Sequence, residues 1–159
     1  MDKSALLTAI VDELERELRL MTDAANTARD EATDEESRAE DRFDMRSQSA
    51  AYLAAGQAKI AGETADALKV YRSLTLKALG TGDPISTGAL VRLEGGGRTG
   101  YYFLGPLRGG LEVSVGNTTV VVLTPNSPLG HQLLGKRMGD RVMLPGKAKP
   151  MEHVISSVE

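Results

Sequence analysis

Apolar positions in the first half of the chain follow a helical period. Two stripes with alternating steps of three and four residues are typical of a coiled-coil seam. The first stripe is Leu7, Val11, Leu14, Leu18, Met21, Ala25 and Ala28, and the second is Ala50, Leu53, Gln57, Ile60, Thr64, Ala67, Tyr71, Leu74 and Ala78. Two consecutive stripes are most simply buried against each other. Residues 1–79 are therefore predicted to form an antiparallel α-helical coiled-coil hairpin, with Ser4 as its N-cap.

The seam becomes thinner toward the connector between the two helices, where alanines replace large aliphatic residues. Small residues allow a close approach of the helices but bury little apolar surface, which suits a thin probe that enters a narrow space. Alanine is also simply a good helix former, so both interpretations stay open. Helices of roughly 35 residues would give a rod on the order of 50 Å long.

The pattern changes after residue 79. The run Gly80-Thr81-Gly82-Asp83-Pro84 is rich in turn-forming residues and predicts a linker over 80–84. Beyond it, short apolar runs separated by glycine-rich turns predict strands over 89–93, 100–104, 111–115, 119–123, 141–144 and 153–158, with one short helix at 128–134. The sequence thus predicts an α+β fold, in which the hairpin precedes a small antiparallel β domain with one short helix over 85–159.

Charge and composition narrow the class of protein. Residues 1–78 carry 16 acidic and 11 basic side chains, and residues 79–159 carry 6 and 8, which argues against a protein that coats nucleic acid. The chain has no cysteine, so disulfides and thiolate metal sites are excluded. It has no apolar run near the roughly 18–20 residues that span a bilayer, and no secretory signal pattern at its start. We expect a cytoplasmic protein with no membrane partner.

The connector between the helices is strongly acidic. Between Asp30 and Asp44 only Arg38 and Arg42 oppose eight carboxylates, which are Asp30, Glu31, Asp34, Glu35, Glu36, Glu40, Asp41 and Asp44. Carboxylate oxygens suit Mg²⁺, which usually takes one or two protein carboxylates and completes its shell with water and phosphate oxygens. A connector of this kind would hold the ion weakly alone and better when another protein adds ligands. The alternative is a solvated acidic face at an exposed helix end.

Other chemistry in the sequence is sparse. His131 and His153 lie in different predicted elements without metal-ligand spacing, so we expect ordinary structural roles for both. The run Gly95-Gly96-Gly97 lacks the Lys-Ser/Thr ending of a phosphate-binding loop and is interpreted as a hairpin turn. No Gly-x-Ser-x-Gly motif is present. A self-sufficient enzyme is not expected.

The stretch 126–142 has the most specific pattern of the chain, Asn-Ser-Pro-Leu-Gly-x-x-Leu-Leu-Gly-Lys-x-x-Gly-Asp-x-Val. Ser127 is predicted to cap a short helix with Pro128 in its first turn, and Gly135 to end it. Leu129, Leu133 and Leu134 would form one apolar face. The pattern resembles the signature of the Gre transcript-cleavage factors, which enter the secondary channel of bacterial RNA polymerase. The run Tyr102-Phe103-Leu104-Gly105-Pro106 is similar to another part of that family.

The resemblance covers essentially the whole chain and implies a coiled coil followed by an FKBP-like domain. It implies that the C-terminal domain docks on bacterial RNA polymerase through Ser127, Pro128, Leu129, Gly130, Leu134 and Gly135. It further implies that carboxylates of the connector help to bind a catalytic Mg²⁺ held jointly with the polymerase. Glu40 and Asp41 are the expected pair, with Asp34, Glu36 and Asp44 as further candidates. The chain would then be an accessory factor rather than an enzyme, acting on the nascent RNA 3′ end through the polymerase.

The connector departs from the family's tip pattern, because Ser37 stands where the family has an aspartate. A second hypothesis is therefore a regulator or inhibitor that occupies the secondary channel without cleavage. A prolyl isomerase, suggested by the FKBP-like fold alone, and a plain coiled-coil scaffold are weaker alternatives. No independent sequence-specific DNA binding is expected. The two apolar stripes can be buried against each other within one chain, so we expect a monomer.

Overall fold

The computed structural model describes residues 2–33, 45–80, 82–145 and 149–159. The chain divides into two compact units, one made of Val11–Lys69 and one that joins Met1–Ile10 to Val70–Glu159. The division predicted from sequence, at 80–84, differs because it assigns the first ten residues and 70–79 to the hairpin. Within the described ranges, no helix is long and apolar enough to cross a membrane.

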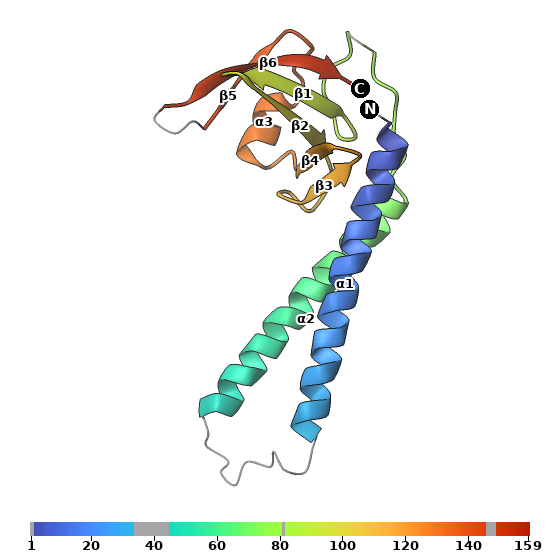
Figure 1. The fold of residues 1–159 in the computed structure, drawn as a ribbon, viewed down its shortest axis with the longest axis vertical. Helices are drawn as coiled ribbons and strands as arrows, with labels where there is room; N and C mark the ends of the chain where they lie inside the picture. The colour runs from blue at the N-terminus through green and yellow to red at the C-terminus, as the bar shows by residue number, and fades with distance from the viewer. Residues whose placement is uncertain (1, 34–44, 81, 146–148) are drawn as a thin grey trace. The chain divides into compact units, whose positions relative to one another are not determined.

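Both expected long helices are present (Figure 1), as α1 (Lys3–Thr33) and α2 (Met45–Arg72). The predicted N-cap is wrong, because Asp2 accepts a 2.8 Å hydrogen bond from the Ser4 main-chain N–H and so caps α1 two residues earlier. The predicted end of α2 near residue 78 is also wrong. Polar and apolar residues alternate over 73–77, a period that does not continue a helical face.

The seam between the helices is buried over a shorter length than the stripes predict. In the helical unit the buried residues of the seam are Leu14, Thr64, Ala67 and Leu68, and residues 52–60 of α2 are all exposed. Leu53 and Ile60, predicted seam residues, are 64% and 46% exposed. The physical reason is that small residues surround these two side chains along α2, so little apolar area is available to hold the helices together there.

The second unit is built on one six-stranded sheet with strand order β3-β4-β2-β1-β6-β5. Its strands are β1 (Leu90–Gly95), β2 (Arg98–Leu104), β3 (Glu112–Val115), β4 (Thr118–Leu123), β5 (Arg141–Leu144) and β6 (Met151–Val158), with helix α3 (Pro128–Leu133) between β4 and β5. All six predicted strands and the short helix are present. The α+β prediction is confirmed, and the bounds of the six strands and of the short helix differ from the predicted ones by at most two residues.

One strand pair departs from the antiparallel prediction, because β2 and β4 run parallel, with Tyr101 opposite Val120. A simple meander would place β3 beside β2. In the structure β4 takes that inner position, and its Val120 and Val122 are fully buried. β3 alternates exposed Glu112 and Ser114 with apolar residues, a pattern that suits the edge of a sheet.

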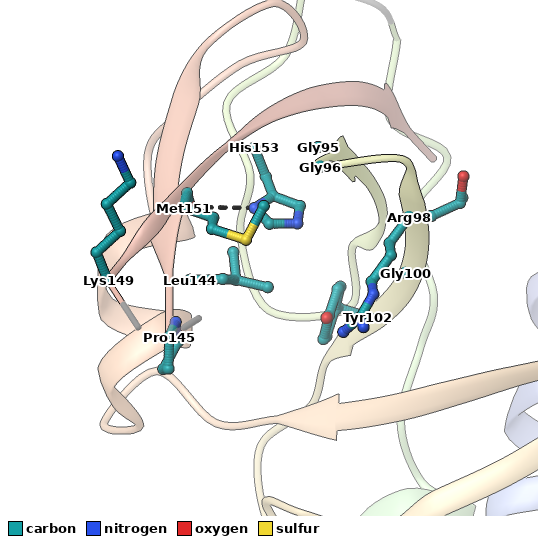
Figure 2. Close-up of a pocket in the computed structure, with 11 residues that line it drawn as sticks. Gly95, Gly96, Arg98, Gly100, Tyr102, Leu144, Pro145, Lys149, Met151 and His153 are labelled. Carbon is teal, nitrogen blue, oxygen red and sulfur yellow. Dashed lines mark hydrogen bonds between the residues drawn. The ribbon is translucent and has the colours of Figure 1, made fainter. Parts of the chain in front are cut away.

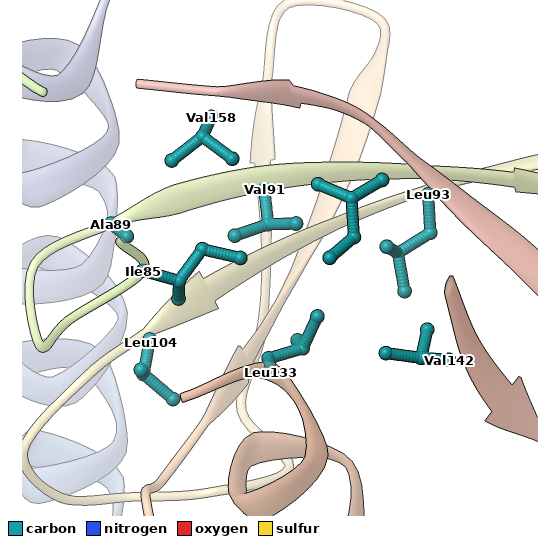
Figure 3. Close-up of a cluster of buried hydrophobic side chains, with 9 residues drawn as sticks. Ile85, Ala89, Val91, Leu93, Leu104, Leu133, Val142 and Val158 are labelled. Carbon is teal, nitrogen blue, oxygen red and sulfur yellow. The ribbon is translucent and has the colours of Figure 1, made fainter. Parts of the chain in front are cut away.

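The core of this unit lies between α3 and one face of the sheet (Figure 3). Leu133 of α3 is fully buried and points toward Val91 and Leu93 of β1. The other members of the cluster are Ile85, Ala89, Leu104, Val142, Ile155 and Val158. Because each strand supplies alternate side chains to this face, the core fixes the position of the segment that carries the 126–142 pattern.

Candidate functional site

The 126–142 segment begins with a tightly bonded helix start. The Ser127 hydroxyl accepts a 3.1 Å hydrogen bond from the Gly130 N–H and donates a 2.8 Å bond to the Thr124 carbonyl. Pro128 occupies the first turn, where no main-chain donor is needed. The predicted capping role of Ser127 is confirmed, and the cap fixes the direction in which α3 leaves the sheet.

Gly130 and Gly135 are required by the backbone of this segment. A Cβ at Gly130 would lie 2.0 Å from the Thr124 carbonyl oxygen, so no other residue fits without displacement of the main chain. Gly135 has a φ of +79°, the left-handed conformation that ends a helix. The predicted helix stop is confirmed. Gly130 is buried, so its part in any docking surface is to shape the segment rather than to present a side chain.

The two adjacent leucines of the pattern lie in opposite environments. Leu133 is fully buried in the core, and Leu129 is half-buried against the same cluster. Leu134 is 46% exposed, so the prediction that it shares the apolar face of Leu129 and Leu133 is wrong. Leu134 is the C-cap residue, and its N–H still bonds to the Gly130 carbonyl. Adjacent residues of a helix point about 100° apart, so the face that buries Leu133 leaves Leu134 at its side.

Further exposed apolar side chains lie in the segment, at Met138, and one residue beyond it, at Met143. Met138 and Met143 are each 46% exposed, as is Leu134. Lys136, Arg137 and Arg141 lie between them in the chain, whereas Asp140 is the only acidic residue of the stretch. The Asp140 carboxylate accepts a 2.8 Å hydrogen bond from the Arg137 main-chain N–H. The segment thus combines exposed apolar groups with a net positive charge.

Gln132 joins α3 to the edge of the sheet. Its side-chain oxygen accepts a 3.0 Å hydrogen bond from the Met143 N–H, and its side-chain nitrogen donates a 3.2 Å bond to the Met143 carbonyl. The amide therefore occupies the hydrogen-bonding position of a neighbouring strand along β5. This contact was not foreseen from the sequence. It holds the segment in place and covers part of an edge that would otherwise be open.

Tyr71 is a second residue whose role the sequence pattern missed. It is fully buried, and its hydroxyl donates a 2.7 Å hydrogen bond to the Leu107 carbonyl. A Cβ at Gly105 would lie 2.2 Å from that hydroxyl, which gives the Gly105-Pro106 turn a packing reason for its glycine. Burial raises the pKa of Tyr71 to about 12. The residue ties the C-terminal end of α2 to the turn after β2.

The acidic candidates lie elsewhere. Asp34, Glu36, Glu40, Asp41 and Asp44, and the turn expected near them, are outside the described residues. Their predicted roles toward Mg²⁺ and RNA stay predictions. Among the residues that the structure does describe, no group of three or more His, Asp or Glu side chains is arranged to hold a metal ion.

Comparisons with known proteins give similar folds at low identity. The chain is 22% identical to GreA factor homolog 1 (Gfh1) of Thermus thermophilus, with 95% of both chains covered and a TM-score of 0.39. It is likewise 22% identical to Gfh1 of Thermus aquaticus, over 95% of this chain and 94% of that one, with a TM-score of 0.39. The transcription elongation factor GreA/GreB from Nitrosomonas europaea is 15% identical over 60% of this chain and 77% of that one, also with a TM-score of 0.39.

No protein-family model and no curated protein matches the chain. Structural likeness at these identities and TM-scores assigns no family and no activity.

Proposed function

We propose that this chain is a Gre-like accessory factor that docks on bacterial RNA polymerase through the 126–142 segment. In this proposal the acidic connector enters the secondary channel and stimulates Mg²⁺-dependent cleavage of backtracked RNA. The observation that carries the docking step is the contrast between Leu133, which is fully buried, and Leu134, which is 46% exposed. The fold needs the first leucine and leaves the second for a partner.

The composition of the segment indicates the kind of partner surface it fits. Exposed Leu134, Met138 and Met143 offer apolar contacts, and methionine adapts to irregular surfaces. Arg141 is paired with Glu152 at 2.6 Å, so Lys136 and Arg137 are the basic residues that favour an acidic partner. The backbone of the segment is held by the Ser127 cap and by the Gln132 bonds to β5, so docking would need little ordering of the main chain.

The connector supplies the proposed chemistry. Glu40 and Asp41 would provide carboxylate oxygens, with Asp34, Glu36 and Asp44 as neighbouring acids, and the polymerase would provide the remaining ligands. When bound, the ion supplies an activated water and stabilises the charge that develops at the phosphate during hydrolysis. The chain itself would supply carboxylates that complete a Mg²⁺ site in the polymerase, and for this reason it would act as an accessory factor.

A second candidate function shares the docking step and omits cleavage. Ser37 stands where the Gre pattern has an aspartate, so the connector offers one carboxylate fewer at that position. A factor of this kind would occupy the channel and inhibit or retune transcription. Its effect would depend on docking residues and much less on Glu40 and Asp41.

The test is RNA cleavage in a stalled, backtracked polymerase complex with Mg²⁺. It compares the unaltered chain with a Glu40→Gln/Asp41→Asn variant and with Leu134→Ser. Glu63→Gln/Asp66→Asn is the matched control, because it removes the same two charges from an exposed part of α2 outside the connector. We expect faster 3′ cleavage with the chain and the control, and loss of that stimulation in both other variants.

Each alternative gives a different pattern in the same assay. Competition with a known cleavage factor, without any cleavage, would support the channel regulator, and Leu134→Ser should then abolish the competition. If the chain neither stimulates cleavage nor competes with a known cleavage factor, the proposed docking on the polymerase is contradicted.

A further inference from the structure

The sheet unit contains a cavity of about 800 Å³ between the β1–β2 hairpin and the β5–β6 hairpin (Figure 2). This volume falls within the roughly 300–1,000 Å³ of pockets that bind small molecules. Tyr102, Leu144 and Met151 supply an apolar wall, and Arg98, Lys149 and His153 supply the charged or polar groups. None of the described residues that line the cavity belongs to the 126–142 signature, and Leu144 of β5 lies two residues beyond it, so the cavity is distinct from the proposed docking segment.

Glycines keep this cavity open where the surrounding rings approach the main chain. A Cβ at Gly100 would lie 2.7 Å from the Tyr102 ring, and one at Gly95 would lie 2.6 Å from the His153 ring and 2.4 Å from the Glu152 carbonyl oxygen. The two rings can therefore lie back against the strands, and the space between them remains open (Figure 2). Side chains at either glycine would push a ring into the cavity.

His153 presents a hydrogen-bond acceptor to this space. Its Nδ1 lies 3.1 Å from the Met151 carbonyl oxygen, and a carbonyl can only accept a hydrogen bond, so Nδ1 carries the proton of the neutral ring. Nε2 is then the unprotonated nitrogen. Figure 2 shows this second nitrogen directed toward the open centre of the cavity. The residue is 9% exposed and its ring is held by the bond to Met151, so the acceptor is preorganised.

The charge of the cavity favours an anion. Its described lining residues include no carboxylate, whereas Arg98 and Lys149 are both cationic. Arg98 extends beside the Tyr102 ring, and the Lys149 ammonium points away from the centre (Figure 2). Arg98 is therefore the group placed to meet an anion, and its planar guanidinium suits the oxygens of a phosphate.

We propose that this cavity binds a nucleoside phosphate. The base lies against Tyr102 and Met151, His153 Nε2 accepts a hydrogen bond from an N–H of the base, and Arg98 binds the phosphate. Aromatic stacking, an apolar wall and one guanidinium together match a ligand that is flat and apolar at one end and anionic at the other. Both a free nucleotide and the end of an RNA chain have this chemistry.

The test is calorimetric titration of the full-length chain with AMP and GMP, without polymerase. Adenosine and inorganic phosphate are titrated as the two halves of the ligand, and 5′-phosphorylated diadenylate as an RNA end. We expect a mononucleotide to bind more tightly than either half. Arg98→Gln should weaken that binding about tenfold or more, since it removes a charge-assisted hydrogen bond. Lys77→Gln is the control, because it removes one positive charge outside the cavity lining and should change the affinity less than about twofold.

Tyr102→Leu should also weaken binding, because it removes the stacking surface. If this variant is less folded by thermal melting, Arg98→Gln still decides the matter, since Arg98 is exposed and packs little. Tighter binding of the diadenylate would assign the site to an RNA end, and equal binding would assign it to a free nucleotide. No saturable binding of AMP or GMP, equal affinity for inorganic phosphate, or an unchanged Arg98→Gln affinity would each overturn the proposal. These outcomes are independent of whether the chain docks on polymerase.

Discussion

The adjacent pair Leu133 and Leu134 gives the sharpest test of the structural reasoning. Leu133 is fully buried against the sheet, and Leu134 is 46% exposed. Truncation of a fully buried leucine to alanine costs about 2–5 kcal/mol, because apolar contacts are lost and a cavity remains. The same truncation at a half-exposed position removes only part of the transfer free energy, about 1 kcal/mol or less. One chemical change, made one residue apart, should therefore have very different effects.

Amide hydrogen exchange in β1 and β6 is the suitable assay, because these strands pack around Leu133. A loss of 2 kcal/mol corresponds to roughly thirtyfold faster exchange of amides that open with the whole unit. We expect at least this acceleration in Leu133→Ala, and about fivefold or less in Leu134→Ala. Equal acceleration in the two variants would refute the assignment of Leu134 to the surface. A folded Leu134→Ala variant is also the variant needed to measure binding to polymerase without a stability defect.

The other predictions concern residues that stabilise each of the two units. Gly130→Ala should destabilise the sheet unit by about 2 kcal/mol or more in urea unfolding, because its Cβ would lie 2.0 Å from a carbonyl oxygen. A Cβ added at Gly62 would meet no atom within 4 Å. Gly62→Ala should therefore stabilise α2 by about 0.5–1 kcal/mol, measured by the loss of helical circular dichroism on heating. Burial raises the pKa of Tyr71 to about 12 in the folded chain, whereas the usual pKa of tyrosine is about 10. The contribution of the neutral, buried hydroxyl to stability is therefore complete below about pH 10 and is lost as the pH rises through 12. Tyr71→Phe should remove this alkaline loss from the pH dependence of unfolding, and an unchanged pH profile would contradict the assignment. Gln132→Ala should cost about 1 kcal/mol and increase concentration-dependent self-association in sedimentation, because it uncovers the edge of β5.

Local signals in the sequence predicted much of the candidate docking segment. Ser127 and Pro128 are favoured at a helix start, and Gly135 at a helix end, for reasons that act over a few residues. The cap and the stop therefore appear where they were expected. The exposure of Leu134 depended instead on which face of the short helix packs against the sheet. Adjacent helical residues point about 100° apart, and the core covers the face that carries Leu133 and not Leu134.

The cavity of Figure 2 shows a different limit. Gly95 and Gly100 were interpreted only as turn or strand residues, and His153 as structural. Their common position arises because the β1–β2 and β5–β6 hairpins are both joined through the β1–β6 pair. The pairing connects residues more than 50 positions apart, and no local pattern contains that information.

The sequence by itself determined the elements of this protein, because helical and strand periods, caps and turns depend on neighbouring residues. It predicted two long helices, six strands, one short helix and an acidic connector between the helices. Only the tertiary structure decided which strand lies inside the sheet, how far along the helices the seam is buried, and which leucine of the 126–142 segment is exposed. These outcomes depend on competition for apolar area between distant segments. β4 lies inside the sheet and β3 lies at its edge, and Leu53 and Ile60 stay exposed because the small residues of α2 offer little apolar area.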